Sequence, residues 1–109
     1  MKKTKNDEVT YQLIVHYAQI IQRITGKPRQ VLMEHAEQAA ILVQRMKTEI
    51  VDFTFIGQDG VVYKERGTLM PYLRDFKKPY RVKNRFILYY NVNKRAWRTF
   101  QLSGLVLNY

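Results

Sequence analysis

The chain has 109 residues, of which 46% are hydrophobic and 26% charged, and 19 Lys and Arg against 9 Asp and Glu give a formal net charge of +10. This length allows one domain with a substantial hydrophobic core. The sequence has no cysteine, which excludes a disulfide scaffold, a thiolate zinc site and a thiol nucleophile. The basic balance makes an acidic partner plausible without identifying one.

The N-terminal residues 1–6 are basic and are expected to form a tail. No apolar run and no small-residue cleavage site of a secretory signal follow them. Polar residues such as His16 and Gln19 interrupt the most apolar stretch, so no window approaches the roughly 18 apolar residues of a membrane span. We therefore expect a cytoplasmic protein with no membrane partner.

Residues 7–47 predict a helical hairpin. Asn6 or Asp7 is expected to cap the first helix, and Gly26 followed by Pro28 ends it. Pro28 also suits the first turn of a second helix, which runs to about residue 47. Each helix has an apolar stripe with helical spacing, formed by Leu13, Ile14, Tyr17, Ile20, Ile21 and Ile24 in the first and by Leu32, Ala36, Ala39, Val43 and Met46 in the second.

Residues 48–109 predict a small curled β-barrel. Only two of the aromatic residues, Tyr11 and Tyr17, precede this part of the chain, and aromatic residues favour strands. Alternating or apolar runs predict five short strands, with an irregular stretch over residues 70–84 between the second and third. The expected strands begin at Val51 and then cover 61–66, 86–92, 96–101 and 105–109, and the first two are joined by a turn at 57–60.

One part of the sequence resembles a known family. Residues 51–69, VDFTFIGQDGVVYKERGTL, precede a Tyr89-Tyr90 pair and the run Trp97-Arg98-Thr99-Phe100. This order is similar to that of the SH3 beta-barrel fold-containing proteins of Bacteroides-type bacteria, their phages and mobile elements. The resemblance implies an SH3-like barrel and a mobile-element context, and it implies no reaction. The predicted fold class is therefore α+β: a two-helix segment followed by a five-stranded SH3-like barrel, in one domain of residues 1–109.

Catalytic patterns are weak, so we expect a non-enzymatic protein with no catalytic residue, cofactor or metal site. His16 and His35 fall on predicted helices without a nearby nucleophile pattern. The acidic residues lack the spacing of metal ligands and are expected to be solvated. The 57–60 segment lacks the Gly-Lys-Ser/Thr ending of a phosphate-binding loop.

The segment 74–85 is the candidate nucleic-acid site. It contains six Lys or Arg and one Asp, so twelve residues have a net charge of +5. Cations meet phosphates through counterion release, and aromatic rings such as Phe76 stack on bases. The predicted contacts with DNA or RNA are Arg74, Lys77, Lys78, Tyr80, Arg81, Lys83 and Arg85. Further cations add contacts if they share a face, namely Lys64, Arg66, Lys94, Arg95 and Arg98. The alternative is that the basic loop is only a solvated connection.

Two other functions stay open. The first is a protein-interaction module whose aromatic groove contains Tyr89, Tyr90 and Trp97, beside Arg98. If Phe100 points inward, Trp97 points outward, where it is covered by the helical hairpin or stacks on a partner. Arg98 could equally be a structural residue paired with an acid or an aromatic ring. The second alternative is a homodimer formed through the helical stripes.

Overall fold

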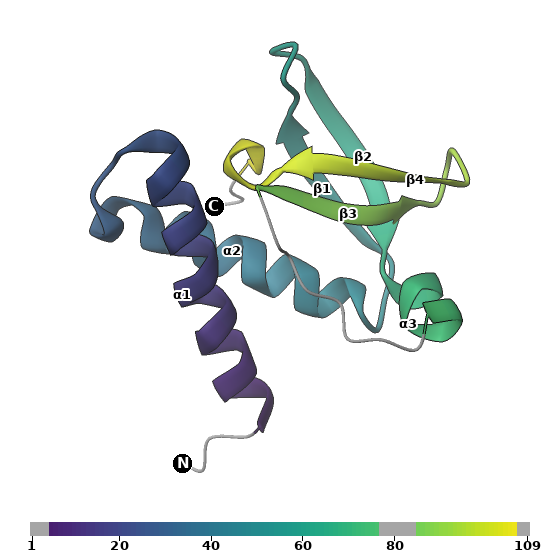
Figure 1. Ribbon diagram of the computed structural model, residues 1–109. Helices are drawn as coiled ribbons and strands as arrows, with labels where there is room; N and C mark the ends of the chain where they lie inside the picture. The colour runs from purple at the N-terminus through teal and green to yellow at the C-terminus, as the bar shows by residue number, and fades with distance from the viewer. Residues whose placement is uncertain (1–4, 77–84, 107–109) are drawn as a thin grey trace.

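The computed structural model describes residues 5–76 and 85–106, with the backbone alone for residues 5–11, 13, 29–31 and 76 (Figure 1). Its four strands form one antiparallel sheet in the order β1-β2-β3-β4. The elements are α1 (Lys5–Thr25), α2 (Arg29–Met46), β1 (Val51–Ile56), β2 (Val62–Thr68), α3 (Met70–Phe76), β3 (Phe86–Asn91), β4 (Ala96–Gln101) and the 3-10 turn η1 (Leu102–Gly104). The α+β class is confirmed. No helix within the described residues is long and apolar enough to cross a bilayer.

The two predicted helices are present as α1 and α2. Gly26 ends α1 with φ of +70°, a left-handed conformation that suits glycine, and donates its N–H to Gln22 O at 2.8 Å. The predicted cap is wrong, because α1 already includes Lys5 and places Asn6 and Asp7 inside the helix.

Most described residues of the two stripes are buried within one chain, but Ile14 is only partly buried and Ile24 is 41% exposed. Ala36, Ala39 and Ala40 are fully buried, and these small side chains let α1 and α2 approach closely. Tyr17 and Ile21 face them from α1. The buried residues of the stripes thus pack on the chain's own core, and a homodimer formed through the helices stays a prediction.

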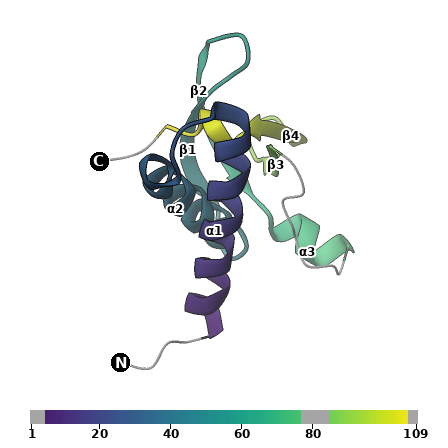
Figure 2. The same ribbon diagram turned by 60° about the vertical axis from the view of Figure 1, so that its left-hand side comes forward.

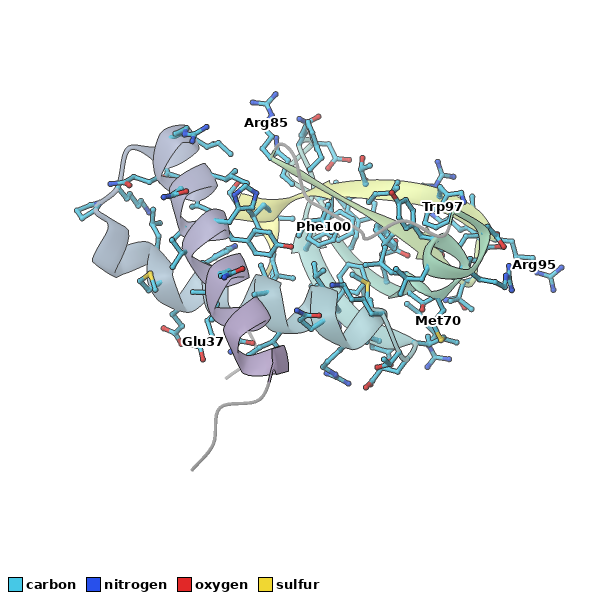
Figure 3. All side chains as sticks on the ribbon, turned by 60° about the horizontal axis from the view of Figure 1, so that its bottom comes forward. Glu37, Met70, Arg85, Arg95, Trp97 and Phe100 are labelled. Carbon is cyan, nitrogen blue, oxygen red and sulfur yellow. The ribbon has the colours of Figure 1, made fainter. Side chains whose placement is uncertain are left out.

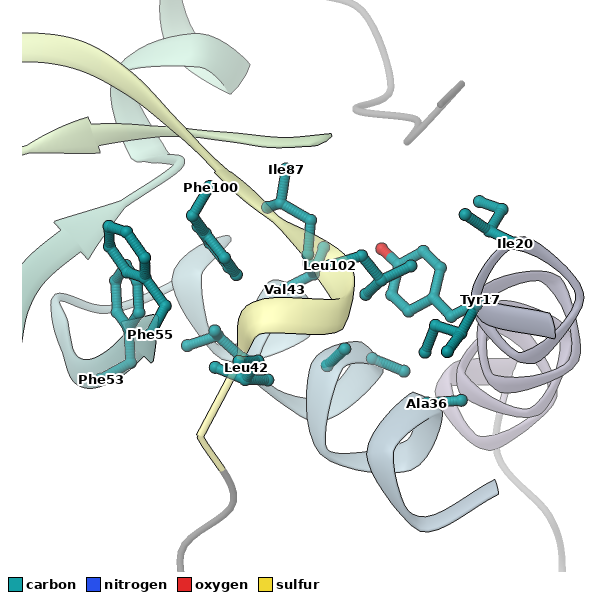
Figure 4. Packing of buried hydrophobic residues seen from close by; sticks show 14 of the residues in the cluster. Tyr17, Ile20, Ala36, Leu42, Val43, Phe53, Phe55, Ile87, Phe100 and Leu102 are labelled. Carbon is teal, nitrogen blue, oxygen red and sulfur yellow. The ribbon is translucent and has the colours of Figure 1, made fainter. Parts of the chain in front are cut away.

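The helices and the sheet share one core (Figure 4). Leu102 and Val43 lie between the helical side, with Tyr17, and the aromatic side, with Phe100. In Figures 1 and 2, α2 runs below the sheet and α1 crosses beside it. His35 fixes this junction, since its Nε2 lies 2.8 Å from Leu102 O. A carbonyl oxygen only accepts, so this ring nitrogen carries the hydrogen.

The segment predicted to be irregular, 70–84, begins with helix α3, which the sequence interpretation missed. Pro71 is its second residue, where a backbone N–H has no helical partner to lose. The hydroxyl of Thr68 accepts the Met70 N–H at 3.2 Å and donates to Met46 O at 3.0 Å. Thr68 therefore joins the end of α2 to the start of α3. Seven residues are too few to display helical periodicity.

The fifth predicted strand, 105–109, is only partly within the described residues. Leu105 forms an isolated antiparallel bridge with Phe55, and Val106 donates its N–H to Thr54 O at 2.9 Å. Residues 107–109 lie outside the described part of the chain. What the structure describes is thus a four-stranded open sheet rather than a closed five-stranded barrel.

The sheet turns a corner at Gly67. The strand β2 extends through Gly67 and Thr68, two residues beyond the predicted strand 61–66, because these residues pair with Asn91 and Tyr90. Beyond this short pairing the hairpin of β1 and β2 diverges from the hairpin of β3 and β4. A Cβ atom on Gly67 would lie 2.5 Å from Cδ2 of the buried Tyr89. The corner therefore requires glycine.

We predict that Gly67→Ala lowers the free energy of unfolding by about 1–3 kcal/mol, because the added methyl group overpacks a buried ring. Chemical denaturation measures the loss. Tyr89→Leu removes that ring, so the double variant should lose less than the sum of the two single losses. Strictly additive losses would contradict the assigned contact.

Candidate functional site

A cleft lies between the two hairpins, and we call it the hairpin cleft. Its volume is about 560 Å³. It exists because β2 and β3 pair only at the Gly67 corner, which leaves the rest of each strand free to face the gap. The first hairpin contributes Phe55, Asp59, Tyr63 and Glu65, and the second contributes Phe86, Tyr89, Lys94, Arg98 and Phe100.

Aromatic rings form the floor of the hairpin cleft. The ring centroids of Phe55 and Tyr63 are 5.2 Å apart with an interplanar angle of 20°, and those of Phe55 and Phe100 are 5.2 Å apart at 22°. These stacked pairs extend the buried core outward to the half-buried Tyr63. A flat ring at the rim of a cleft is a surface on which a planar ligand can stack.

The predicted turn at 57–60 is confirmed, and it holds Tyr63 in place. Gly57 donates its N–H to Val61 O at 2.9 Å, and Gly60 adopts φ of +79°. Asp59 accepts the Tyr63 hydroxyl at 2.6 Å and the Val61 N–H at 3.0 Å. The bond from Tyr63 lowers the pKa of the Asp59 carboxyl below its usual value and raises the pKa of the phenol.

Polar groups meet at the centre of the cleft, around the hydroxyl of Tyr89. Asn91, 1% exposed, donates from Nδ2 to Glu65 Oε2 at 2.7 Å and accepts the Lys94 N–H at 3.0 Å. Burial raises the pKa of Tyr89, and the negative charge of Glu65 raises it further. A hydrogen bond with Asn91 and the positive charge of Arg98 oppose this shift. Glu65 and Arg98 therefore both act on the same hydroxyl.

Exposed cations gather at the end of the second hairpin. Lys94 and Arg95 lie in the turn between β3 and β4, and Arg98 projects from β4 into the hairpin cleft. Figure 3 shows Arg95 at the tip of this hairpin. Within residues 5–76 and 85–106, none of these three cations forms an ion pair.

Three other described cations are neutralised locally by carboxylates, in the pairs Arg45 with Glu49 at 2.7 Å, Arg66 with Asp52 at 2.9 Å and Arg74 with Asp75 at 2.8 Å. These pairs are exposed and add little to stability. The walls of the hairpin cleft consequently differ in charge. The first hairpin presents carboxylates, and the second presents unpaired cations.

Of the predicted phosphate contacts, the structure describes only two, at either end of the segment. Arg74 lies at the end of α3 and is engaged by Asp75. Arg85 precedes β3, and its guanidinium carbon lies 5.2 Å from the centroid of the Phe86 ring. The remaining predicted contacts lie outside the described residues: Lys77, Lys78, Tyr80, Arg81 and Lys83.

The predicted aromatic groove of Tyr89, Tyr90 and Trp97 is not formed. Tyr89 is 1% exposed and packs in the core, whereas Tyr90 and Trp97 lie together on the opposite face with ring centroids 5.4 Å apart. Neighbouring residues of a strand point to opposite faces, so no single groove can contain all three. The outward direction of Trp97 is confirmed. Tyr72 of α3 lies against Trp97, with ring centroids 6.2 Å apart, in place of the expected helical hairpin.

The further cations proposed from the sequence do not share one face. Lys64 and Arg66 alternate with Glu65 on β2 and therefore project from the outer side of the sheet, away from Arg98. Sequence interpretation singled out neither Tyr63 nor Glu65 as a binding residue. In the register of β1 and β2, Glu65 is opposite Phe53 and Tyr63 is opposite Phe55, so both lie on the inner face of the sheet.

Comparisons with known proteins give one match. A protein-family model described as WYL_2, Sm-like SH3 beta-barrel fold, matches residues 39–106, which is more than half of the chain. No curated protein and no solved structure matches significantly. The match includes α2 from residue 39, the whole sheet, α3 and η1.

We predict that acid releases Tyr63 from Asp59. The folded-state pKa of Asp59 is depressed below the ordinary 3.8, so the bond is fully present above about pH 4. It is lost as the pH falls through that lower folded value. The NMR signals of the Tyr63 ring should report the change, and Asp59→Asn should abolish it and return the phenol pKa toward its usual value. A Tyr63 transition that survives in Asp59→Asn would contradict the assignment.

Proposed function

The chain belongs to the WYL_2 family, with its Sm-like SH3 beta-barrel fold, and within that fold we propose that it is a non-enzymatic protein that binds single-stranded nucleic acid in the hairpin cleft. The observation that carries this proposal is the coincidence of an aromatic floor with cations that form no ion pair in the part of the chain that the structure describes. Lys94, Arg95 and Arg98 lie on one hairpin, beside the cleft that Tyr63 lines. Phosphates bind such cations, and bases stack on such rings.

The distribution of charge supports one orientation of the strand. Lys94 and Arg95 lie in the turn of the second hairpin, so the phosphates lie along this turn and the bases enter the cleft between Arg98 and β2. The carboxylate of Asp59 is already engaged by Val61 and Tyr63, which reduces its repulsion of a polyanion. A single strand fits this arrangement better than a duplex because its bases are free to enter the cleft.

The basic segment 74–85 extends this surface in the proposal. Its first residue, Arg74, belongs to α3, which touches β4 through the contact between Tyr72 and Trp97. Its last residue, Arg85, leads into β3, and its carbonyl accepts the Leu102 N–H at 2.8 Å. Both ends of the segment are thus attached to the second hairpin. We propose that Lys77, Lys78, Arg81 and Lys83 add phosphate contacts there.

Closure of the barrel is part of the same proposal. The antiparallel bridge between Phe55 and Leu105 sets a register in which residues 107–109 would continue along β1 toward Val51. A fifth strand, 105–109, would then complete the barrel. The resemblance noted above implies a phage or mobile-element context, and we propose an accessory role there in the cytoplasm.

A salt titration tests the proposal. Lys94→Gln combined with Arg95→Gln should weaken binding of a fluorescent single-stranded oligonucleotide and reduce the slope of log K against log salt by about 1.4, since each lost contact removes about 0.7. The matched control is Arg23→Gln combined with Lys27→Gln, which changes the net charge equally near the junction of α1 and α2, far from the second hairpin (Figure 1). Equal slopes for the two double variants would overturn the proposed surface.

The basic segment has its own test. Lys77→Glu combined with Lys78→Glu should weaken the same oligonucleotide further, because two attractive charges become repulsive. Unchanged binding would restrict the interface to the hairpin cleft. Capture of a protein partner that survives nuclease and moderate salt, without oligonucleotide binding, would favour a protein-interaction module instead.

A further inference from the structure

We propose that the hairpin cleft selects guanine among unpaired bases, with Glu65 and Arg98 reading two edges of the base. This inference rests on the proposed function, because it names the base that the bound strand would present. It arises from one arrangement. A carboxylate on the first hairpin and a guanidinium on the second flank the same tyrosine hydroxyl without forming an ion pair with each other in the described structure.

The carboxylate of Glu65 is held in position and still able to accept hydrogen bonds. Its Oε2 accepts Nδ2 of the buried Asn91 at 2.7 Å, which fixes the group on the β2 side of the cleft. Its Oε1 accepts no hydrogen bond from the described residues. An ionised carboxylate accepts only, so a ligand that reaches it must bring N–H or O–H donors.

Arg98 requires a ligand with hydrogen-bond acceptors, because a guanidinium only donates. The side chain is exposed, lines the hairpin cleft and has no carboxylate partner within the described residues. In the register of β3 and β4 it lies opposite Tyr89, and it lines the hairpin cleft from the second hairpin while Glu65 lines it from the first. A guanidinium donates in a planar fork, which suits two adjacent acceptors.

Guanine meets both requirements in one planar group. It has two adjacent donors, N1–H and the N2 amino group, and two adjacent acceptors, O6 and N7. Adenine and uracil have neither the adjacent donors nor the adjacent acceptors, and cytosine lacks the adjacent donors. Tyr63, held by Asp59 and stacked on Phe55, supplies a ring that lines the same cleft. Stacking alone tolerates every base, so selectivity comes from the two charged groups.

The test compares short single-stranded oligonucleotides that differ at one central base, at one salt concentration, by fluorescence anisotropy. Guanine should bind about tenfold more tightly than adenine or cytosine, the range expected for one good bidentate contact. Inosine lacks the N2 amino group and 7-deazaguanine lacks the N7 acceptor, so each should lose most of that advantage.

Variants assign the two edges. Glu65→Gln keeps an acceptor for Asn91 but loses one of the two carboxylate oxygens, so the ratio of guanine to adenine affinity should fall severalfold. The matched control is Glu37→Gln on the exposed face of α2 (Figure 3), which changes the charge equally and should leave the ratio unchanged. Arg98→Lys keeps the positive charge and should preserve the salt slope while it reduces the preference for guanine over 7-deazaguanine.

The outcomes separate the two proposals. Equal, salt-dependent binding of all bases would overturn guanine selection and leave nucleic-acid binding standing. A guanine preference that survives Glu65→Gln and Arg98→Lys would also overturn this site. Absence of binding to every oligonucleotide would overturn both proposals.

Discussion

The contact between Gly67 and the ring of Tyr89 is the constraint on which the rest of the structure depends. The strand β2 leaves β1 and meets β3 at this point, and only a residue without a side chain leaves room for the buried ring. The same ring packs edge-on against Phe53 and Phe100, so the corner is continuous with the core. Because pairing of β2 with β3 stops there, the two hairpins diverge and the hairpin cleft opens. Fold and site thus have one origin.

The residues next to the corner connect it to the helical layer. Thr68 bonds to Met46 at the end of α2, and Leu69 is fully buried and donates its N–H to the same carbonyl at 2.8 Å. At the other end of the sheet, His35 of α2 bonds to Leu102. One helix therefore forms hydrogen bonds at the ends of both hairpins. In the run 67–69, Gly67 forms the corner, Thr68 joins α2 to α3, and Leu69 packs in the core.

The sequence predicted the local structure well because local structure has a local signal. Helical spacing identified α1 and α2, alternation identified β1, and the Asp59-Gly60 pair identified its turn. The corner was not predictable, because Gly67 lay beyond the predicted strand 61–66 and its pairing with Asn91 joins residues far apart in the chain. Glu65 and Arg98 were not connected for the same reason. The helix α3 was missed because seven residues with a proline display no period, and its start depends on Thr68.

The position of Glu65 distinguishes the two proposals, which are binding of a single strand and selection of one base. On a surface that binds polyanions without selectivity, each carboxylate weakens binding by repulsion. In the three described ion pairs the carboxylate is neutralised by an adjacent cation. Glu65 is different, because Asn91 holds it inside the cleft, where it repels phosphate and reaches no cation within the described residues. Such an acid weakens binding unless the ligand offers it donors. Bases offer donors and phosphates do not. In the proposal, the net charge attracts the strand, and the carboxylate of Glu65 gives the cleft a means to distinguish one base from another.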